Sequence, residues 1–243
     1  MDVGVNLWRD WLVVLDFDGT ITTEDASEAM LSEFADPSWI EIDRSYARGE
    51  IGVAELMSRE FALVAVGQIE LLDFVLGRAK VRPHFREFAD LALERGVELF
   101  LLSAGLDFYI EAVLEREEIG RYFTRAYYLQ TEFGSEGIRC RLPELSRPLE
   151  PLADYKRAVV DELRNRGRRI AYAGDGDTDR RAAEAADLVF ARRKLAAHCR
   201  LAGVPYVAFE DFRDIVEGME SRLTGSRGSP ADGEAPKRES FRG

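Results

Sequence analysis

The stretch W-L-V-V-L-D-F-D-G-T, residues 11–20, decides which fold this chain can adopt. Residues 11–15 form a short, nearly continuous apolar run, which suits a strand that is covered on both faces. Two carboxylates, Asp16 and Asp18, follow this run directly and are succeeded by a glycine. Open parallel sheets bind their ligands at the carboxyl ends of their strands, so the stretch predicts a functional site at this strand end.

Comparable apolar runs recur later in the chain, and helix-like segments precede most of them. The further strands are predicted at 97–102, 169–173, 187–191 and 205–209, and the helices at 84–95, 107–118, 154–166, 178–186 and 193–202. Strands that alternate with helices predict an α/β fold with helices on both faces of a mainly parallel sheet, as in Rossmann-like, doubly wound domains.

The long interval between the first two strands carries no strand signal. Residues 25–80 have apolar positions at helical spacing and are interrupted by Gly and Pro, so they predict a helical cap domain inserted into an α/β core of residues 1–24 and 81–220. Residues 130–153 predict a hairpin followed by an irregular loop. Residues 221–243 are rich in Gly, Ser, Pro and charge, which predicts a disordered tail.

Composition excludes several classes of function. The 243 residues are 46% hydrophobic, enough for one sizeable core, and 45 acidic against 33 basic side chains leave a formal charge of −12. This charge repels phosphate backbones and anionic lipids, so we expect neither nucleic-acid nor membrane binding. The two cysteines, Cys140 and Cys199, form no C-x-x-C pair, and no apolar run approaches the ~20 residues of a membrane span, so a cytoplasmic protein is predicted. Its oligomeric state, monomer or homodimer, stays open.

A second acidic cluster, G-D-G-D-T-D at 174–179, follows the strand predicted at 169–173. It supplies Asp175, Asp177 and Asp179, of which Asp177 is favoured as a turn former. Carboxylates from two neighbouring strand ends concentrate negative charge, and a hard divalent cation makes such a site tolerable. Sites with few carboxylates that also accept a phosphate suit Mg²⁺ better than Ca²⁺.

Two more residues complete a set of groups for phosphate chemistry. Ser103 follows the strand predicted at 97–102 and opens S-A-G-L-D, where a helix start would leave N–H groups free to hold an anion. Lys156 lies at the start of the helix predicted at 154–166 and can offer one positive charge to a phosphate. A carboxylate nucleophile, a hydroxyl, a lysine and a metal together indicate phosphoryl transfer through an aspartyl-phosphate.

These motifs resemble those of phosphatases of the haloacid dehalogenase-like (HAD) superfamily that carry a helical, C1-type cap. The four matching motifs are D-F-D-G-T (16–20), L-L-S-A-G (101–105), Lys156 and G-D-G-D-T-D (174–179). Within the superfamily the chain looks most like the phosphoserine phosphatase branch, and in particular like the 2-hydroxy-3-keto-5-methylthiopentenyl-1-phosphate phosphatases. That finer likeness rests on I-T-T-E-D (21–25), R-P-H-F (82–85) and D-L-V-F-A-R (187–192).

The resemblance implies a role for each motif residue. Asp16 would attack phosphorus, and Asp18 would protonate the leaving oxygen and later activate water. Mg²⁺ would be held by the Asp16 carboxylate, the Asp18 backbone carbonyl and Asp175, with Asp179 positioning the metal shell. The phosphoryl oxygens would be bound by Ser103, Lys156 and the main-chain N–H groups of Phe17, Asp18, Ala104 and Gly105. Further candidates for substrate contact are Thr20, Asp25 and Arg59, the last with Glu60 beside it.

The function predicted in this way is Mg²⁺-dependent hydrolysis of a phosphomonoester, with a small phosphorylated metabolite as substrate. A phosphoserine-like and a methylthiopentenyl-phosphate-like substrate both stay open. Two other functions also stay open. One is phosphoryl transfer to a second substrate, as in sugar phosphomutases, which product analysis would reveal. The other is a phospho-binding module that keeps the fold without turnover.

Overall fold

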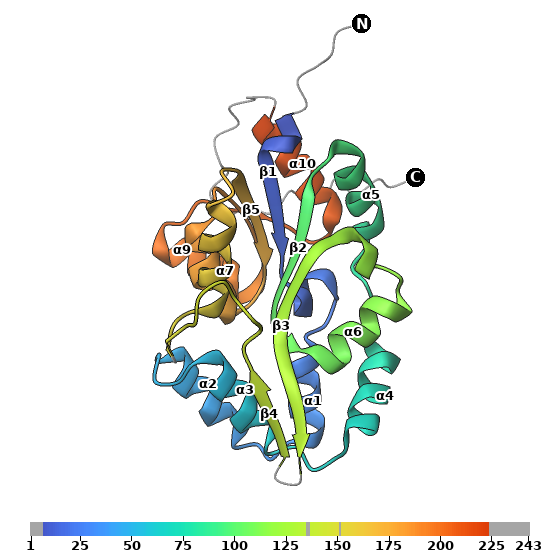
Figure 1. Cartoon of the computed structure of the whole chain (residues 1–243), viewed down its shortest axis with the longest axis vertical. Coiled ribbons are helices and arrows are strands. Elements are labelled where there is room, and N and C mark those ends of the chain that lie inside the picture. The colour runs from blue at the N-terminus through green and yellow to red at the C-terminus, as the bar shows by residue number, and fades with distance from the viewer. Residues whose placement is uncertain (1–6, 135–136, 151, 224–243) are drawn as a thin grey trace, which may run out of the picture.

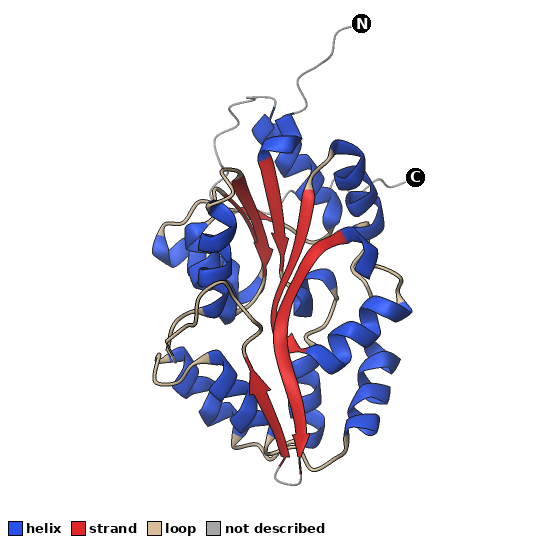
Figure 2. Ribbon diagram, viewed as in Figure 1, coloured by secondary structure: helices blue, strands red, loops and turns tan. Residues whose placement is uncertain are grey.

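The computed structural model describes residues 7–134, 137–150 and 152–223. Its centre is a seven-stranded sheet in the order β4-β3-β2-β1-β5-β6-β7, in which neighbouring strands are parallel except β3 and β4 (Figures 1 and 2). The strands are β1 Trp11–Leu15, β2 Glu98–Leu106, β3 Phe123–Gly134, β4 Gly137–Arg141, β5 Arg169–Gly174, β6 Leu188–Ala191 and β7 Val207–Ala208. The predicted α/β fold with a mainly parallel sheet is confirmed.

Helices cover both faces of this sheet, as Figure 1 shows, with α5, α6 and α10 on one side and α7 and α9 on the other. Helix α8 packs against α7 and β5. The helices are α1 Ala26–Phe34, α2 Trp39–Ala47, α3 Val53–Phe61, α4 Gln68–Arg78, α5 Phe85–Arg95, α6 Asp107–Arg116, α7 Tyr155–Arg164, α8 Arg180–Ala185, α9 Arg193–Ala202 and α10 Phe212–Leu223. Short 3-10 turns lie at Leu7–Asp10, Gly120–Tyr122 and Asp177–Asp179, and a tight turn spans Phe17–Ile21. No helix in these described ranges is both long and apolar enough to cross a membrane.

Strand β1 lies at the centre of the sheet, and all five of its side chains are fully buried. It pairs in parallel with β2 on one side, Leu15 opposite Leu101, and with β5 on the other, Leu15 opposite Ala173. The backbone N–H of Asp16 continues the ladder by donating to the carbonyl of Ala173 at 2.9 Å. The register therefore brings the residues after β1 and after β5 to one edge of the sheet.

Helices α1 to α4 fill the interval between β1 and β2 and lie together below that edge in Figure 1. The β3–β4 hairpin runs down beside them, and β4 packs against α3. The Ser58 hydroxyl of α3 accepts a hydrogen bond from the backbone N–H of Cys140 in β4 at 2.8 Å. The hairpin thus joins this helical group to the sheet.

Two elements differ from the sequence prediction. The antiparallel hairpin spans Gln130–Arg141, as predicted, but its first strand begins already at Phe123, and this early part of β3 forms the parallel neighbour of β2. The apolar pattern that would predict β3 from the sequence is weak, because only Tyr127 and Leu129 of this strand are buried and the other residues are exposed or half-buried.

Helix α10 was not predicted at all. It buries Phe212, Ile215 and Met219 on one face, and Phe212 packs on Phe85 of α5 with ring centroids 5.0 Å apart. Residues 221–223 of the predicted tail belong to this helix, and residues 224–243 lie outside the described part of the chain.

Candidate active site

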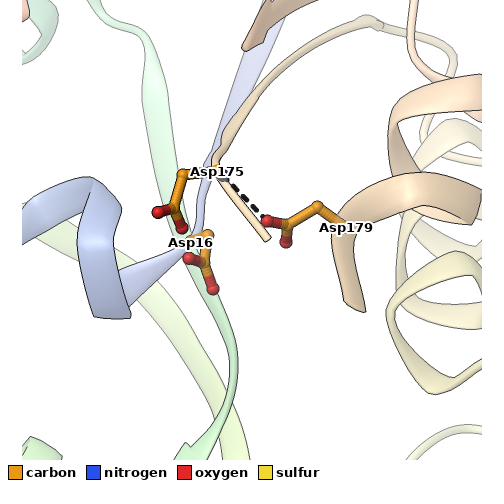
Figure 3. Close-up of side chains that lie close together, drawn as sticks. All are labelled: Asp16, Asp175 and Asp179. Atoms are coloured by element: carbon orange, nitrogen blue, oxygen red, sulfur yellow. Dashed lines mark hydrogen bonds between the residues drawn. The ribbon is translucent and has the colours of Figure 1, made fainter. Parts of the chain in front are cut away.

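Three carboxylates from two segments distant in sequence meet at the carboxyl edge of the sheet (Figure 3). Asp16 follows β1, Asp175 follows β5, and Asp179 ends the turn after it. One carboxylate oxygen of each lies within 4.8 Å of the others, and all three side chains are buried. The two acidic clusters of the sequence are therefore brought together.

Lys156 neutralises part of this charge. It stands in the first turn of α7, whose N-terminus is capped by the Asp154 side chain accepting from the N–H of Arg157 at 2.8 Å. Its Nζ donates to Oδ1 of Asp16 and to Oδ1 of Asp179, each at 2.6 Å. Burial disfavours the ammonium, but the two carboxylates outweigh burial and raise the pKa of Lys156.

Asp179 organises the loop that carries Asp175. Its Oδ2 accepts hydrogen bonds from the backbone N–H groups of Asp175 and Gly176, both at 2.9 Å. Its Oδ1 accepts a further bond from the hydroxyl of Tyr172 at 2.7 Å. Sequence reasoning missed Tyr172. Its signal is that of a tyrosine in a buried strand, whose hydroxyl needs a partner.

The environment raises the pKa of the two other carboxylates, Asp16 and Asp175, and so disfavours their ionised forms. Burial, with Asp179 next in effect, raises the pKa of Asp16 well above its usual value despite the opposing Lys156. Burial, followed by the charges of Asp179 and Asp25, raises the pKa of Asp175 to about 7. A set of oxygen donors with this excess of negative charge fits a hard divalent cation such as Mg²⁺.

Asp18 is set apart from this group by its own hydrogen bonds. The hydroxyl of Tyr109, on α6, donates to its Oδ2 at 2.5 Å, and the N–H of Ala26 donates to its Oδ1 at 3.0 Å. Burial and then the charge of Asp25 raise the pKa of Asp18 to about 8, although both hydrogen bonds oppose the shift. The protonated acid is thus accessible near neutral pH, which suits a proton donor. Tyr109 was not singled out from the sequence.

Ser103 is placed differently from the prediction. Strand β2 continues to Leu106 and helix α6 begins only at Asp107, so Ser103 lies inside a strand and not at a helix start. The pairing of β2 with β3 is irregular between Leu102 and Leu106, and this irregularity turns the backbone locally. The Ser103 hydroxyl accepts from the N–H of Gly105 at 2.9 Å. A helix N-terminus therefore does not form the expected anion cradle.

A cavity of about 200 Å³ opens between this edge of the sheet and helices α1 to α3. The predicted residues that line it are Asp16, Asp18, Asp25, Ser103, Ala104, Gly105, Asp175 and Asp179. Lys156 lines an adjoining cleft. Thr20 and Arg59 are not brought to the cavity: Thr20 is fully buried elsewhere, and Arg59 is half-exposed and faces Glu55 at 3.5 Å. Glu60, beside Arg59, does line the cavity.

Arg82 is a further residue that sequence reasoning missed. Its buried guanidinium donates to the backbone carbonyls of Gly19, Thr20 and Thr22 at 2.6, 2.7 and 2.9 Å. It also donates to the carbonyl of Glu210 at 3.2 Å. The Arg82 guanidinium therefore contacts three carbonyls in and directly after the turn that carries Asp18.

Comparison with known proteins agrees with this geometry. Residues 12–187 match the family model described as haloacid dehalogenase-like hydrolase. A 2-hydroxy-3-keto-5-methylthiopentenyl-1-phosphate phosphatase of Bacillus velezensis is 29% identical over 88% of this chain and 91% of its own length. A protein of the same description from Geobacillus kaustophilus is 30% identical over 87% of this chain and 96% of its own.

Solved structures show the same fold. A probable phosphoserine phosphatase from Vibrio cholerae superposes with a TM-score of 0.63 at 17% identity, covering 89% of this chain and 66% of that one. A phosphoserine phosphatase with an analogue of its phospho-aspartyl intermediate gives a TM-score of 0.62 at 15% identity, covering 85% and 97%.

The chain belongs to the haloacid dehalogenase-like hydrolases. The two relatives in sequence named above are described as phosphatases, and the predictions of a HAD-superfamily member and of a phosphatase are confirmed.

Proposed function

We propose that this protein is a Mg²⁺-dependent phosphomonoesterase that hydrolyses a small phosphorylated metabolite through an aspartyl-phosphate on Asp16. One observation carries the proposal. The buried carboxylate of Asp16 is hydrogen-bonded to Lys156 and lies close to the carboxylates of Asp175 and Asp179. Two residues after Asp16, the side chain of Asp18 accepts a hydrogen bond from Tyr109. These are a nucleophile, a cation site and a proton donor in one cavity.

The donor set supports a metal at this place. The carboxylates of Asp16 and Asp175 and the backbone carbonyl of Asp18 would hold Mg²⁺, with Asp179 fixing the loop around it. When bound, the ion would neutralise charge on the phosphoryl oxygens. Ser103 and Lys156 would bind the same phosphoryl group, Lys156 exchanging one of its carboxylate bonds for a phosphoryl oxygen.

The side chains can then divide the reaction into two displacements. An Asp16 oxygen attacks phosphorus, the bond from phosphorus to the leaving oxygen breaks, and protonated Asp18 gives its proton to that oxygen. In the second step the Asp18 carboxylate takes a proton from water, the water oxygen bonds to phosphorus, and the bond to Asp16 breaks. Inorganic phosphate leaves, and both aspartates regain their starting states.

Helices α1 to α4, residues 25–80, are proposed to act as the cap over this site. They supply one wall of the cavity, and closure would keep bulk water away until the phosphoenzyme has formed. We further propose a cytoplasmic setting, in which the buried thiols of Cys140 and Cys199 stay reduced.

The test is turnover of p-nitrophenyl phosphate and of a panel of phosphorylated metabolites by wild type, Asp16→Asn and Asp177→Asn. Asp177 also lines the cavity, but its carboxylate pairs with Arg180 and Lys194, so D177N is a matched control. We expect D16N to abolish phosphate release, D177N to retain it, and EDTA to stop the wild type reversibly. Turnover by D16N at the wild-type rate would refute the proposal. Phosphate appearing on an added acceptor would indicate a phosphotransferase.

A further inference from the structure

The hydroxyl of Tyr109 lies in a chain of hydrogen bonds that joins Asp18 to helix α1. Tyr109 donates to Oδ2 of Asp18 at 2.5 Å, and its oxygen lies 3.0 Å from the Ser27 hydroxyl. Ser27 is the second residue of α1, whereas Tyr109 belongs to α6. The chain therefore links three separate segments: the turn after β1, helix α6 and the first helix of the helical group.

Packing fixes the ring of Tyr109. The residue is fully buried, and its ring lies 5.5 Å from that of Phe108 and 6.5 Å from that of Phe17, centroid to centroid. Gly105 leaves the space in which the hydroxyl meets the carboxyl, since a Cβ on Gly105 would lie 2.5 Å from Oδ2 of Asp18 and would collide with the hydroxyl. The phenol thus has one position, from which its hydroxyl reaches the carboxyl of Asp18.

The carboxyl of Asp18 depends on its partners for its orientation. The terminal torsion of an aspartate is broad, so the rotamer of the side chain alone does not fix the plane of the two oxygens. Within the described residues, Tyr109 bonds to Oδ2, and the N–H of Ala26 bonds to Oδ1 at 3.0 Å. Removing the Tyr109 hydroxyl would leave one oxygen without this partner and the plane of the carboxyl free to turn.

We propose that Tyr109 is a positioning residue for proton transfer to the leaving group: its hydroxyl, oriented by Ser27, holds the carboxyl of Asp18 toward the leaving oxygen. The inference rests on the proposed phosphatase function, in which Asp18 is the proton donor, and adds a residue that acts through it. Among the described residues, Asp18 and Ser27 line the cavity and Tyr109 does not. Tyr109 therefore acts on the ester only through the carboxyl that it holds.

The effect of such a residue depends on the alcohol that leaves. A strongly basic alkoxide needs a proton as its bond to phosphorus breaks, whereas p-nitrophenolate is stable as an anion and leaves without one. A misplaced acid therefore slows alkyl esters and spares p-nitrophenyl phosphate. A general distortion of the site slows both kinds of ester.

The test measures kcat/KM, which covers the steps up to release of the alcohol, for n-propyl, phenyl and p-nitrophenyl phosphate. We expect Tyr109→Phe to lower kcat/KM for the propyl ester about tenfold, the worth of one hydrogen bond to a charged group. The p-nitrophenyl ester should lose less than about twofold, and phenyl phosphate should fall between the two. Ser27→Ala should act in the same direction by about threefold, the worth of a neutral hydrogen bond.

Tyr122→Phe is the matched control. Tyr122 is also a buried tyrosine whose hydroxyl donates to a carboxylate, Oδ1 of Asp90 at 2.9 Å, but it lies outside the cavity. Y122F should keep the wild-type ratio of propyl to p-nitrophenyl ester. Urea unfolding checks that each variant is folded.

A double-mutant cycle separates positioning from a structural role. In an Asp18→Asn background, Y109F should change kcat/KM for phenyl phosphate less than about twofold, because the carboxyl through which Tyr109 acts is gone.

Equal losses on all three esters in Y109F, an unchanged rate on the propyl ester, or an undiminished effect of Y109F in the D18N background overturns the role of Tyr109. In each of these cases D16N-sensitive hydrolysis of p-nitrophenyl phosphate leaves the phosphatase standing. Absence of any D16N-sensitive hydrolysis overturns both.

Discussion

Replacing Arg82 by Met tests whether one buried side chain holds the catalytic turn. The guanidinium makes three hydrogen bonds of 2.6 to 2.9 Å to the carbonyls of Gly19, Thr20 and Thr22. Each charge-assisted bond contributes about 1.5–3 kcal/mol, so the three alone have an upper limit of roughly 5–9 kcal/mol. Burial lowers the pKa of Arg82 to about 10, and the cost of burying the charged guanidinium offsets much of that sum.

We therefore expect R82M to lower the free energy of unfolding by about 3 kcal/mol, which for a chain of this size lowers Tm by roughly 6–12 °C. The same change should reduce kcat/KM for p-nitrophenyl phosphate about 100-fold well below Tm, because displacing reacting groups by about 1 Å has that effect. Urea titration and steady-state kinetics measure the two quantities.

Arg86→Met provides the control, since Arg86 lies on the neighbouring helix, is half-exposed and forms a surface pair with Glu117 at 3.2 Å. Its loss should change stability by less than about 1 kcal/mol. If R82M unfolds with the same free energy as the wild type and keeps its kcat/KM within twofold, the carbonyl contacts do not hold the turn and the reasoning is wrong.

Two more predictions concern the cavity. In Gly105→Ala the new Cβ would lie 2.5 Å from Oδ2 of Asp18 and collide with the Tyr109 hydroxyl, so we expect kcat to fall about 100-fold. Gly77→Ala is the control, because a Cβ there meets nothing within 4 Å, and it should leave the kinetics unchanged. Equal kcat values in the two variants would contradict this packing. Folding raises the pKa of Glu60 from 4.5 to about 8, so the folded chain binds this proton more tightly than the unfolded chain does. The stabilisation that comes from this tighter proton binding is complete below about pH 4.5 and is lost as pH rises to 8. Urea unfolding should therefore show E60Q gaining stability over the wild type between pH 5 and 8, and parallel pH profiles would argue against a buried, unpaired carboxyl.

The strand at 11–15 and the turn after it could be predicted from the sequence because their signals are local. Five consecutive apolar residues require a strand buried on both faces, and the carboxylates at its end then fall where parallel sheets bind ligands. The second acidic cluster follows β5 by the same rule. That the two clusters meet follows from the pairing of β1 with β5.

Local signals failed where a residue's role depends on a distant partner. Tyr109 is 91 positions from Asp18, and Arg82 is more than 60 positions from the turn it contacts. No spacing rule links residues so far apart, because only the packing of α6 and of the α4–α5 connection on β1 brings them together. Ser103 was misplaced for a related reason, since the irregular pairing of β2 with β3 extends the strand past it.

The sequence by itself thus determined the class of fold, the edge of the sheet that carries the chemistry and the acidic residues gathered there, since apolar runs and strand-end motifs are properties of adjacent residues. Only the tertiary structure decided which side chains complete the site. Glu60 rather than Arg59 lines the cavity because α3 turns one of two adjacent residues inward and the other toward solvent. Neighbours in sequence differ in function here because a helix rotates each residue by about 100° from the last.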